Sequence, residues 1–146
     1  MRTDNSFMEA AAQTAKSSTC CSVPKGAIIV KDNNIIASGY NNVPNGVIPC
    51  SIKYGGCYRR KLGYASGEGL QYCKGIHAEA MAIHAAEKNG LETSKATLYT
   101  THFPCDECAK LIINSGISRV LYSHEYKATF TKELFSKANV HVERLT

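Results

Sequence analysis

The stretch ATLYTTHFPCDECAKLIINSGISRVLYS, residues 96–123, decides the fold because it contains a strand, a helix and a strand in succession. Aliphatic, aromatic and β-branched residues predict strands over 96–101 and 119–123. Between them a proline opens and a glycine closes a predicted helix over 105–115. Two strands joined through one helix form parallel neighbours in a sheet, so the sequence predicts an α/β fold.

Outside this unit, hydrophobic periodicity predicts the rest of the fold. The expected elements are a helix over 4–16 capped by Asp4 or Ser6, hairpin strands over 27–30 and 35–36, helices over about 77–89 and 128–138, and a strand over 140–144. Residues 32–34, DNN, tolerate the left-handed turn of a tight hairpin. Helices then cover both faces of a sheet of about five strands, which gives three layers.

The length and composition fit one domain over 1–146. With 146 residues, 44% of them hydrophobic, the chain can bury a core without disulfides. Residues 41–76, which we call the insert, are rich in Gly, Pro, Asn and Ser and show no clear periodicity, which predicts a long loop. A loop of that length inside a small domain is usually functional.

The cysteine content and the net charge restrict which cellular compartment and which binding partners the sequence fits. Seven cysteines cannot all pair within one chain, no signal-peptide-like apolar segment opens the sequence, and the longest aliphatic run, AIIV at 27–30, is too short for a bilayer. A reduced, cytoplasmic setting without a membrane partner is therefore expected. The net charge is +5, but the basic residues are scattered, with YRRK at 58–61 as the tightest group. No polynucleotide-binding stripe is apparent, and a small anionic substrate fits the charge equally well.

Three residues have the spacing of a catalytic zinc site. Cys105 and Cys108 lie three apart at the start of a predicted helix, so their sulfurs share one face and the helix N-terminus favours their thiolates. His77 would add a nitrogen ligand. This set suits Zn²⁺ and leaves the fourth tetrahedral position for water, as in catalytic sites. Glu79, two residues from His77, would lie near that water and act as the proton shuttle.

Each half of this pattern has an ordinary explanation by itself. His-x-Glu occurs at exposed helix starts, and Cys-x-x-Cys also forms structural zinc half-sites and redox pairs. The combination is more specific, because His-x-Glu opening one helix and Pro-Cys-x-x-Cys opening the next is the pattern of zinc deaminases. We interpret His84 and His102 as surface or packing histidines, although His102 stays a further candidate for the site.

The chain resembles the cytidine and deoxycytidylate deaminase superfamily over nearly its whole length, and most of all the deoxycytidylate (dCMP) deaminases. The segments that carry the resemblance are STCCSVPKGAIIV at 18–30, SGYNNVPNG at 38–46, GCYRRKLGYASGEGLQYCKGIHAEAMAI at 56–83 and LYTTHFPCDECAKLIINSGISRVLY at 98–122. The resemblance implies zinc held by His77, Cys105 and Cys108, with Glu79 as acid and base. It also implies an αβα sandwich with a mixed five-stranded sheet.

Comparison with other groups of the superfamily makes some substrate classes less suitable for this chain. Free-nucleoside cytidine deaminases generally have cysteine in place of His77, and riboflavin-pathway deaminases have many more residues between their two zinc cysteines. The segment EAMAI at 79–83 is closer to the tRNA adenosine deaminases, because Met81 stands where dCMP deaminases usually have Asn. The segments GYNNVPNG and SGEG match the dCMP deaminases.

The resemblance also implies contacts with the substrate. Asn41 should hydrogen-bond the sugar 3′-hydroxyl, and the backbone of Ala78 should face the pyrimidine O2. Tyr126 and Lys25 should lie at the phosphate end. The alternatives are a turn-forming Asn41 and a Tyr126 that belongs to the core.

The other cysteines form a second candidate metal site. In some phage and bacterial relatives a structural zinc uses cysteines at the positions of Cys20 and Cys50, with further ligands from the insert. The insert has few aliphatic residues, so a metal would supply stability that packing does not. Cys73 and Cys57 are candidate further ligands, and inert buried thiols are the alternative.

The function implied by the resemblance is zinc-dependent hydrolysis of dCMP to dUMP and ammonia, which supplies thymidylate synthesis. It includes dCTP as a further candidate substrate, regulation by dCTP with Mg²⁺ and by dTTP, and assembly into homo-oligomers such as hexamers. A tRNA adenosine deaminase is the alternative enzyme, which would need a basic groove and stacking aromatics. A non-catalytic zinc module is a third class, in which Glu79 would have no purpose.

Overall fold

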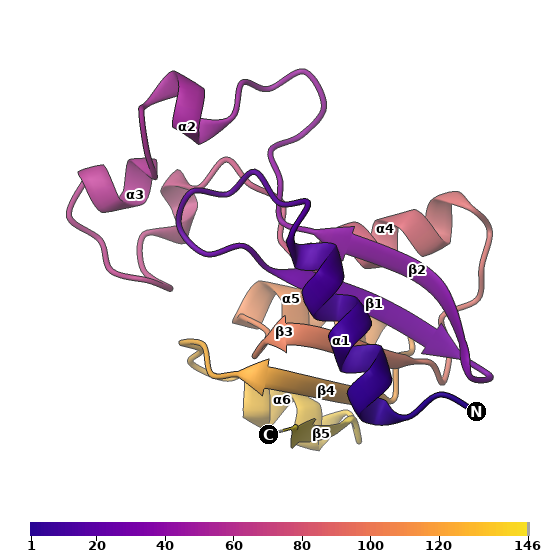
Figure 1. Ribbon diagram of the computed structural model, residues 1–146. Coiled ribbons are helices and arrows are strands. Elements are labelled where there is room, and N and C mark those ends of the chain that lie inside the picture. Colours follow the sequence, from indigo (N-terminus) through magenta and orange to yellow (C-terminus); the bar gives the residue numbers. More distant parts are fainter. Residues whose placement is uncertain (146) are drawn as a thin grey trace.

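Five strands form one mixed sheet in the computed structural model, which describes residues 1–145 (Figure 1). The strands are β1 (Gly26–Lys31), β2 (Asn34–Tyr40), β3 (Thr97–His102), β4 (Arg119–His124) and β5 (His141–Arg144). Their order is β2-β1-β3-β4-β5, in which β1 is antiparallel to β2 and β3, whereas β3, β4 and β5 are parallel. The predicted hairpin followed by parallel strands is confirmed.

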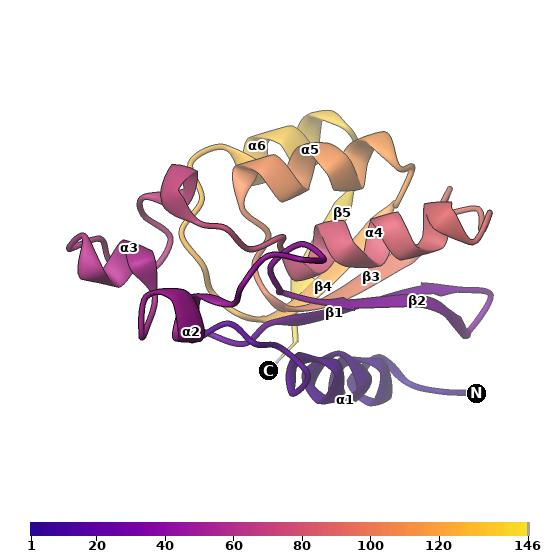
Figure 2. The same cartoon turned by 90° about the horizontal axis from the view of Figure 1, so that it is seen from above.

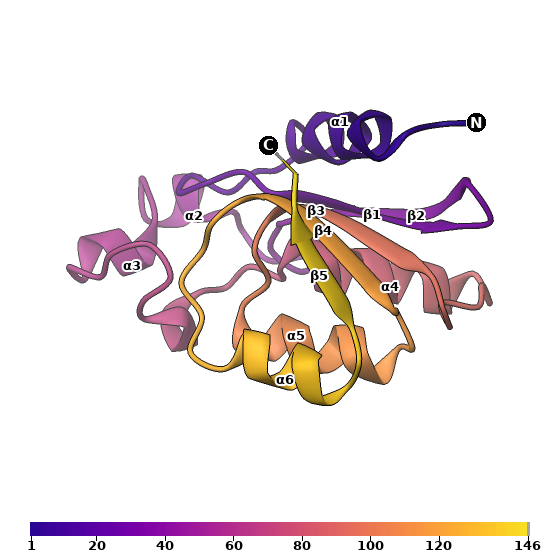
Figure 3. The same ribbon diagram turned by 90° about the horizontal axis from the view of Figure 1, so that it is seen from below.

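Helices cover both faces of this sheet. They are α1 (Asp4–Ala15), α4 (Ala78–Lys88), α5 (Asp106–Asn114) and α6 (Thr131–Lys137). Figures 2 and 3 show α1 on one face and α4, α5 and α6 on the other, which confirms the three-layer αβα sandwich. Within residues 1–145 the longest helix, α1, has 12 residues, and every helix is too short or too polar to cross a lipid bilayer. The single-domain organisation over 1–146 stays a prediction.

Alternate side chains of β1 enter two separate cores. Ala27 and Ile29 belong to the larger core under α4, α5 and α6, whereas Ile28 and Val30 belong to the core under α1. All four are buried, so β1 is a central strand with both faces covered.

The start of α4 lies very close to the sheet at Gly39 in β2. A Cβ atom at this position would lie 2.4 Å from the backbone nitrogen of Ala82 and 2.5 Å from the carbonyl oxygen of Ala78. No side chain fits in that space, so the contact requires glycine. This packing fixes the first turn of α4, which carries Glu79, against the sheet.

The hairpin turn agrees with the sequence prediction, but one helix cap does not. Asp32 and Asn33 adopt φ angles of 51° and 62°, as a two-residue hairpin turn requires. The predicted caps of α1, Asp4 and Ser6, were wrong. Thr3 is the cap, because its backbone is extended and its hydroxyl accepts a hydrogen bond from the Ser6 backbone nitrogen at 3.2 Å.

The insert is more ordered than the predicted loop. It contains three one-turn helices, which are α2 (Cys50–Lys53), α3 (Tyr58–Lys61) and the 3-10 helix η1 (Leu70–Tyr72). Tyr58 stacks on Tyr54 with 4.5 Å between ring centroids, and Tyr64 stacks on Tyr72 at 5.7 Å. Aromatic contacts therefore supply part of the packing that the missing aliphatic residues do not. The insert lies beyond the carboxyl ends of β3 and β4 (Figure 1).

Candidate zinc and substrate site

The candidate metal ligands lie where two helices begin beside the insert. His77 and Cys105 immediately precede α4 and α5, respectively, and both have extended backbones. Cys108 lies in the first turn of α5, one turn after Cys105. Because both helix N-termini point into this region, their dipoles favour thiolates and other negative charge there.

The three ligand atoms lie close enough to hold one ion. The Nδ1 atom of His77 is 3.3 Å from the sulfur of Cys105 and 3.4 Å from that of Cys108, and all three lie within 4.8 Å of one another. Tetrahedral zinc, with a Zn–N bond of about 2.0 Å and Zn–S bonds of about 2.3 Å, needs N···S separations of about 3.5 Å. The residues present therefore fit zinc, through Nδ1 of the histidine.

The cysteine pair already favours a thiolate. The pKa of the Cys105 thiol is lowered to about 4, because Cys108 and the His77 imidazole hydrogen-bond to its sulfur. The pKa of Cys108 is raised, since it shares that hydrogen bond and is buried. One negative sulfur faces the histidine before any cation is bound, which suits a site for a soft divalent cation.

Glu79 is a buried carboxyl group in the first turn of α4. Its side chain is only 5% exposed, and burial raises its pKa above the ordinary value. The charges of His77 and Lys25 act in the opposite direction. A carboxyl group shielded from water beside a metal site is suited to proton transfer.

Three of the four predicted substrate residues line one pocket that also includes His77. Lys25, Asn41 and Tyr126 line this pocket, whereas Ala78, directly after His77, is fully buried. The ammonium group of Lys25 lies 3.3 Å from the centre of the Tyr126 ring, a cation–π contact. Burial lowers the pKa of Lys25 and raises that of Tyr126 to about 12.

Asn41 holds the chain segment that precedes β1. Its side-chain oxygen accepts hydrogen bonds from the Lys25 backbone nitrogen at 2.8 Å and from the Ser18 hydroxyl at 2.6 Å. Its amide nitrogen donates to the carbonyl oxygen of Val23 at 2.9 Å. Within residues 1–145 the amide nitrogen makes this one hydrogen bond, so its second N–H is left for a ligand.

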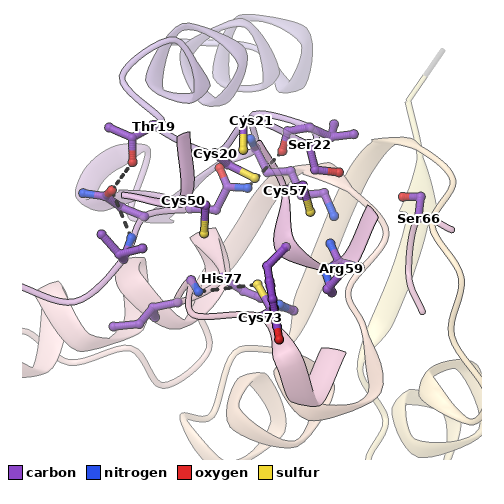
Figure 4. A pocket seen from close by; sticks show the side chains of 18 of the residues that line it. Thr19, Cys20, Cys21, Ser22, Cys50, Cys57, Arg59, Ser66, Cys73 and His77 are labelled. Atoms are coloured by element: carbon purple, nitrogen blue, oxygen red, sulfur yellow. Dashed lines mark hydrogen bonds between the residues drawn. The ribbon is translucent and has the colours of Figure 1, made fainter. Parts of the chain in front are cut away.

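The remaining cysteines gather in the same pocket. Cys20, Cys21, Cys50, Cys57 and Cys73 all line it, and Figure 4 shows them around one space. They are free thiols drawn from the segment before β1 and from the insert. Within residues 1–145, however, no three of them bring their sulfurs within 4.8 Å of one another, whereas the ligand atoms of His77, Cys105 and Cys108 do lie that close.

The other two histidines considered in the sequence analysis lie outside the candidate metal site. His84 is exposed on α4, whereas His102 stacks on His124 at the ends of β3 and β4, with 5.0 Å between ring centroids. Burial and the nearby charges of Lys25 and His124 lower the pKa of His102 to about 4. His102 therefore packs as a neutral side chain outside the residues that line the pocket.

The sequence analysis missed one charged residue of this pocket, Arg59. It belongs to the segment YRRK, which was interpreted as the tightest basic group of the chain and as part of the family resemblance, without a role for Arg59 itself. Arg59 is 6% exposed and lines the pocket with Ser66, whereas Arg60 beside it is exposed. No periodicity distinguishes the two arginines in sequence, so only the fold identifies the buried one.

An αβα sandwich with a histidine and two cysteines at adjoining helix starts defines the class of zinc deaminases. The family profile described as "Cytidine and deoxycytidylate deaminase zinc-binding region" matches residues 1–124. The chain therefore belongs to the cytidine and deoxycytidylate deaminase family.

Known relatives agree with this assignment. The chain is 38% identical to "ComE operon protein 2" of Bacillus subtilis over 141 residues, covering 95% of this chain and 69% of that protein. It is also 38% identical to the deoxycytidylate deaminase of Mycobacterium phage D29 over 127 residues, covering 84% and 94% of the two chains. The structure of the dCMP deaminase of cyanophage S-TIM5, in complex with dCMP and dUMP, superposes with a TM-score of 0.80 at 27% identity, covering 99% of each chain.

Proposed function

We propose that this enzyme hydrolyses the amino group of dCMP, giving dUMP and ammonia. The observation that carries the proposal is the buried carboxyl group of Glu79 beside the His77, Cys105 and Cys108 cluster. The substrate follows from the relatives named deoxycytidylate deaminase and from the similar cyanophage enzyme in complex with dCMP and dUMP. Two cationic side chains in the pocket, those of Lys25 and Arg59, support an anionic substrate.

Each residue of the cluster has a separate task in this proposal. His77, Cys105 and Cys108 would hold zinc, which supplies an activated water for attack at C4 of the cytosine ring. Glu79 moves the protons: it delivers one to N3 and a second to the departing amino group, so that ammonia rather than an amide ion leaves. Asn41 and the Ala78 backbone would orient the sugar and the ring, which keeps C4 next to these groups.

The cysteines of the insert, together with Cys20 from the segment before β1, support a second, structural zinc in the same proposal. Cys20, Cys50 and Cys73, with Cys57, come from two segments that lie far apart in sequence yet line one pocket. A metal among them would tie the insert to the segment before β1, provided that their side chains close around it. This would stabilise a region that otherwise depends on tyrosine stacking.

The family resemblance extends the proposal to metabolism and regulation. The dUMP produced would supply thymidylate synthesis in the cytoplasm. We expect dCTP, with Mg²⁺, and dTTP to act as effectors, and homo-oligomers such as hexamers to form. Turnover of dCTP itself, titration of dCMP turnover with both effectors, and the molar mass in solution would test these expectations.

A comparison of substrates tests the proposed reaction. Zinc-loaded enzyme is assayed side by side with dCMP, dCTP, cytidine and an anticodon stem-loop RNA that contains adenosine. We expect dCMP to have the highest kcat/KM. Preferential conversion of the RNA would instead assign the enzyme to the tRNA adenosine deaminases, and no turnover by zinc-replete protein would favour the non-catalytic module.

A further inference from the structure

The carboxylate of Asp106 holds the loop that connects β4 to α6. Asp106 is the first residue of α5, directly after Cys105. Its oxygens accept hydrogen bonds from the backbone nitrogens of Thr129 at 3.1 Å and Phe130 at 2.9 Å. The buried Thr131 hydroxyl lies 3.0 Å from the same carboxylate. One side chain of α5 therefore contacts three successive residues where the loop ends.

Loop 125–130 has few other attachments. Within residues 1–145, the last two residues of this loop are the ones whose backbone N–H groups have an acceptor, and that acceptor is Asp106. The other polar attachments are side-chain contacts of Glu125 and Lys127, both of which are exposed. Exposed ion pairs contribute little, whereas hydrogen bonds from a buried or half-buried backbone to a carboxylate are among the stronger ones. Asp106 is thus the main anchor of the loop.

The loop carries Tyr126, which forms one wall of the pocket beside His77. Tyr126 lines this pocket and packs against the larger core, and the centre of its ring lies 3.3 Å from the ammonium group of Lys25. Figures 2 and 3 show the loop on the side of the molecule that carries the insert. Asp106 itself is not among the residues that line the pocket. The position of this wall therefore depends on a residue that lies outside the pocket, next to a candidate zinc ligand.

We propose that Asp106 is a positioning residue, which holds Tyr126 at the pocket and so raises the affinity for the substrate without entering the chemistry. The inference rests on the proposed deamination of dCMP. Because the loop is fixed before the substrate arrives, the substrate does not have to order it, and preorganisation of this kind increases affinity. The first turn of α5 then has two tasks: its cysteines would hold zinc, and Asp106 sets the position of a pocket wall.

A second interpretation is that the Asp106 carboxylate only stabilises α5. An acidic residue in the first turn of a helix interacts favourably with the helix dipole. Glu107 lies in the same turn, but it is exposed and its carboxylate is paired with Lys110 at 3.0 Å. Removal of either carboxylate should affect the helix dipole similarly, whereas only Asp106 of the two contacts the loop. Glu107 is therefore the matched control.

The test compares Asp106→Ala and Asp106→Asn with Glu107→Ala. We measure kcat and KM for dCMP, zinc per chain and the thermal midpoint. Loss of the charged anchor should raise KM about 10-fold in Asp106→Ala, with kcat within about twofold of the wild type and zinc unchanged. Asp106→Asn should recover part of the loss, because its amide oxygen still accepts from the loop backbone. Glu107→Ala should leave KM at the wild-type value.

A double-mutant cycle shows whether Asp106 acts through Tyr126. Tyr126→Ala should raise KM by itself. Adding Asp106→Ala should then raise KM by no more than about twofold, because the loop no longer carries the wall that Asp106 positions. If the two effects multiply instead, Asp106 does not act through Tyr126 and the proposal is overturned.

Calorimetric binding of dUMP separates this inference from the proposed reaction, because binding needs no turnover. Weaker binding in Asp106→Ala, but not in Glu107→Ala, would support the positioning role even if the wild type fails to deaminate dCMP, which would refute the proposed function only. No binding of dUMP to the wild type would overturn both proposals.

Four other results would overturn the role of Asp106: unchanged KM and dUMP binding, a loss confined to kcat, a loss of zinc, or an equal effect in Glu107→Ala. Should Asp106→Ala fail to fold, which its thermal midpoint reports, Asp106→Asn decides. A raised KM at wild-type zinc content then supports the role, and a wild-type KM overturns it.

Discussion

Replacing Glu79 with glutamine should abolish deamination while leaving the fold intact. The side chain is 5% exposed and lies in the first turn of α4, which is fixed against β2. Glutamine has almost the same volume, so the packing should hold and the free energy of unfolding should change by no more than about 1 kcal/mol. The amide cannot accept or deliver a proton. The whole proton-transfer contribution is therefore lost, at least about a thousandfold in kcat or about 4 kcal/mol.

The assay for Glu79→Gln quantifies dUMP from dCMP by chromatography, together with zinc per chain and the thermal midpoint. Glu87→Gln is the matched control, because Glu87 is exposed on the same helix. It should retain wild-type activity, which excludes a general effect of removing one carboxylate from α4. Activity of Glu79→Gln near the wild-type level would refute the proton-shuttle role. A simultaneous loss of zinc would make Glu79 a ligand instead.

Three other predictions concern the metals and the α1 face of the sheet. Cys105→Ser should lower the zinc content by about one per chain and abolish turnover, since it removes one of three ligands; unchanged zinc in elemental analysis would contradict the ligand assignment. Cys50→Ser should reduce about two zinc per chain to about one and make the insert protease-sensitive; about one zinc in metal-replete wild type would refute the second site. The Tyr99 hydroxyl donates to Asp4 at 2.5 Å, and burial followed by that contact raises the Tyr99 pKa from 10.0 to about 12. The folded state therefore favours the protonated phenol, and its contribution to the free energy of unfolding is fully present below pH 10. This contribution is lost as the pH rises towards 12, which lowers the free energy of unfolding by up to about 2–3 kcal/mol. In denaturant titrations between pH 10 and 12, the free energy of unfolding should fall less in Tyr99→Phe than in the wild type. An identical fall in the two proteins would contradict the role given to the Tyr99 hydroxyl.

The sheet and its covering helices were predictable because each has a strong local signal. The aliphatic residues of β1 are flanked by turn-forming Asp32 and Asn33, and the α5 segment starts after a proline and ends before Gly116. The candidate metal ligands were predictable for the same reason. His77, Cys105 and Cys108 owe their proximity to two helix starts at one edge of the mixed sheet, which the order of elements already implies.

The features that were missed depend on tertiary contacts. The helix expected over 128–138 begins only at Thr131, because the Asp106 carboxylate accepts hydrogen bonds from the backbone of Thr129 and Phe130 and holds that segment outside the helix. The one-turn helices of the insert are too short for a periodic signal. Arg59 has the same local sequence signal as Arg60, and only burial distinguishes them. Sequence patterns report local periodicity and do not record which side chain a long-range contact buries.

The most direct test of the central claim follows a single reaction of zinc-loaded wild-type protein with dCMP and quantifies dUMP and ammonia together. Hydrolysis at C4 by the His77, Cys105, Cys108 and Glu79 site predicts that the two products form in equal amounts and that neither forms once a chelator has removed the zinc. Absence of dUMP and ammonia from protein shown to contain zinc would contradict the account, as would undiminished formation of both products by the zinc-free protein.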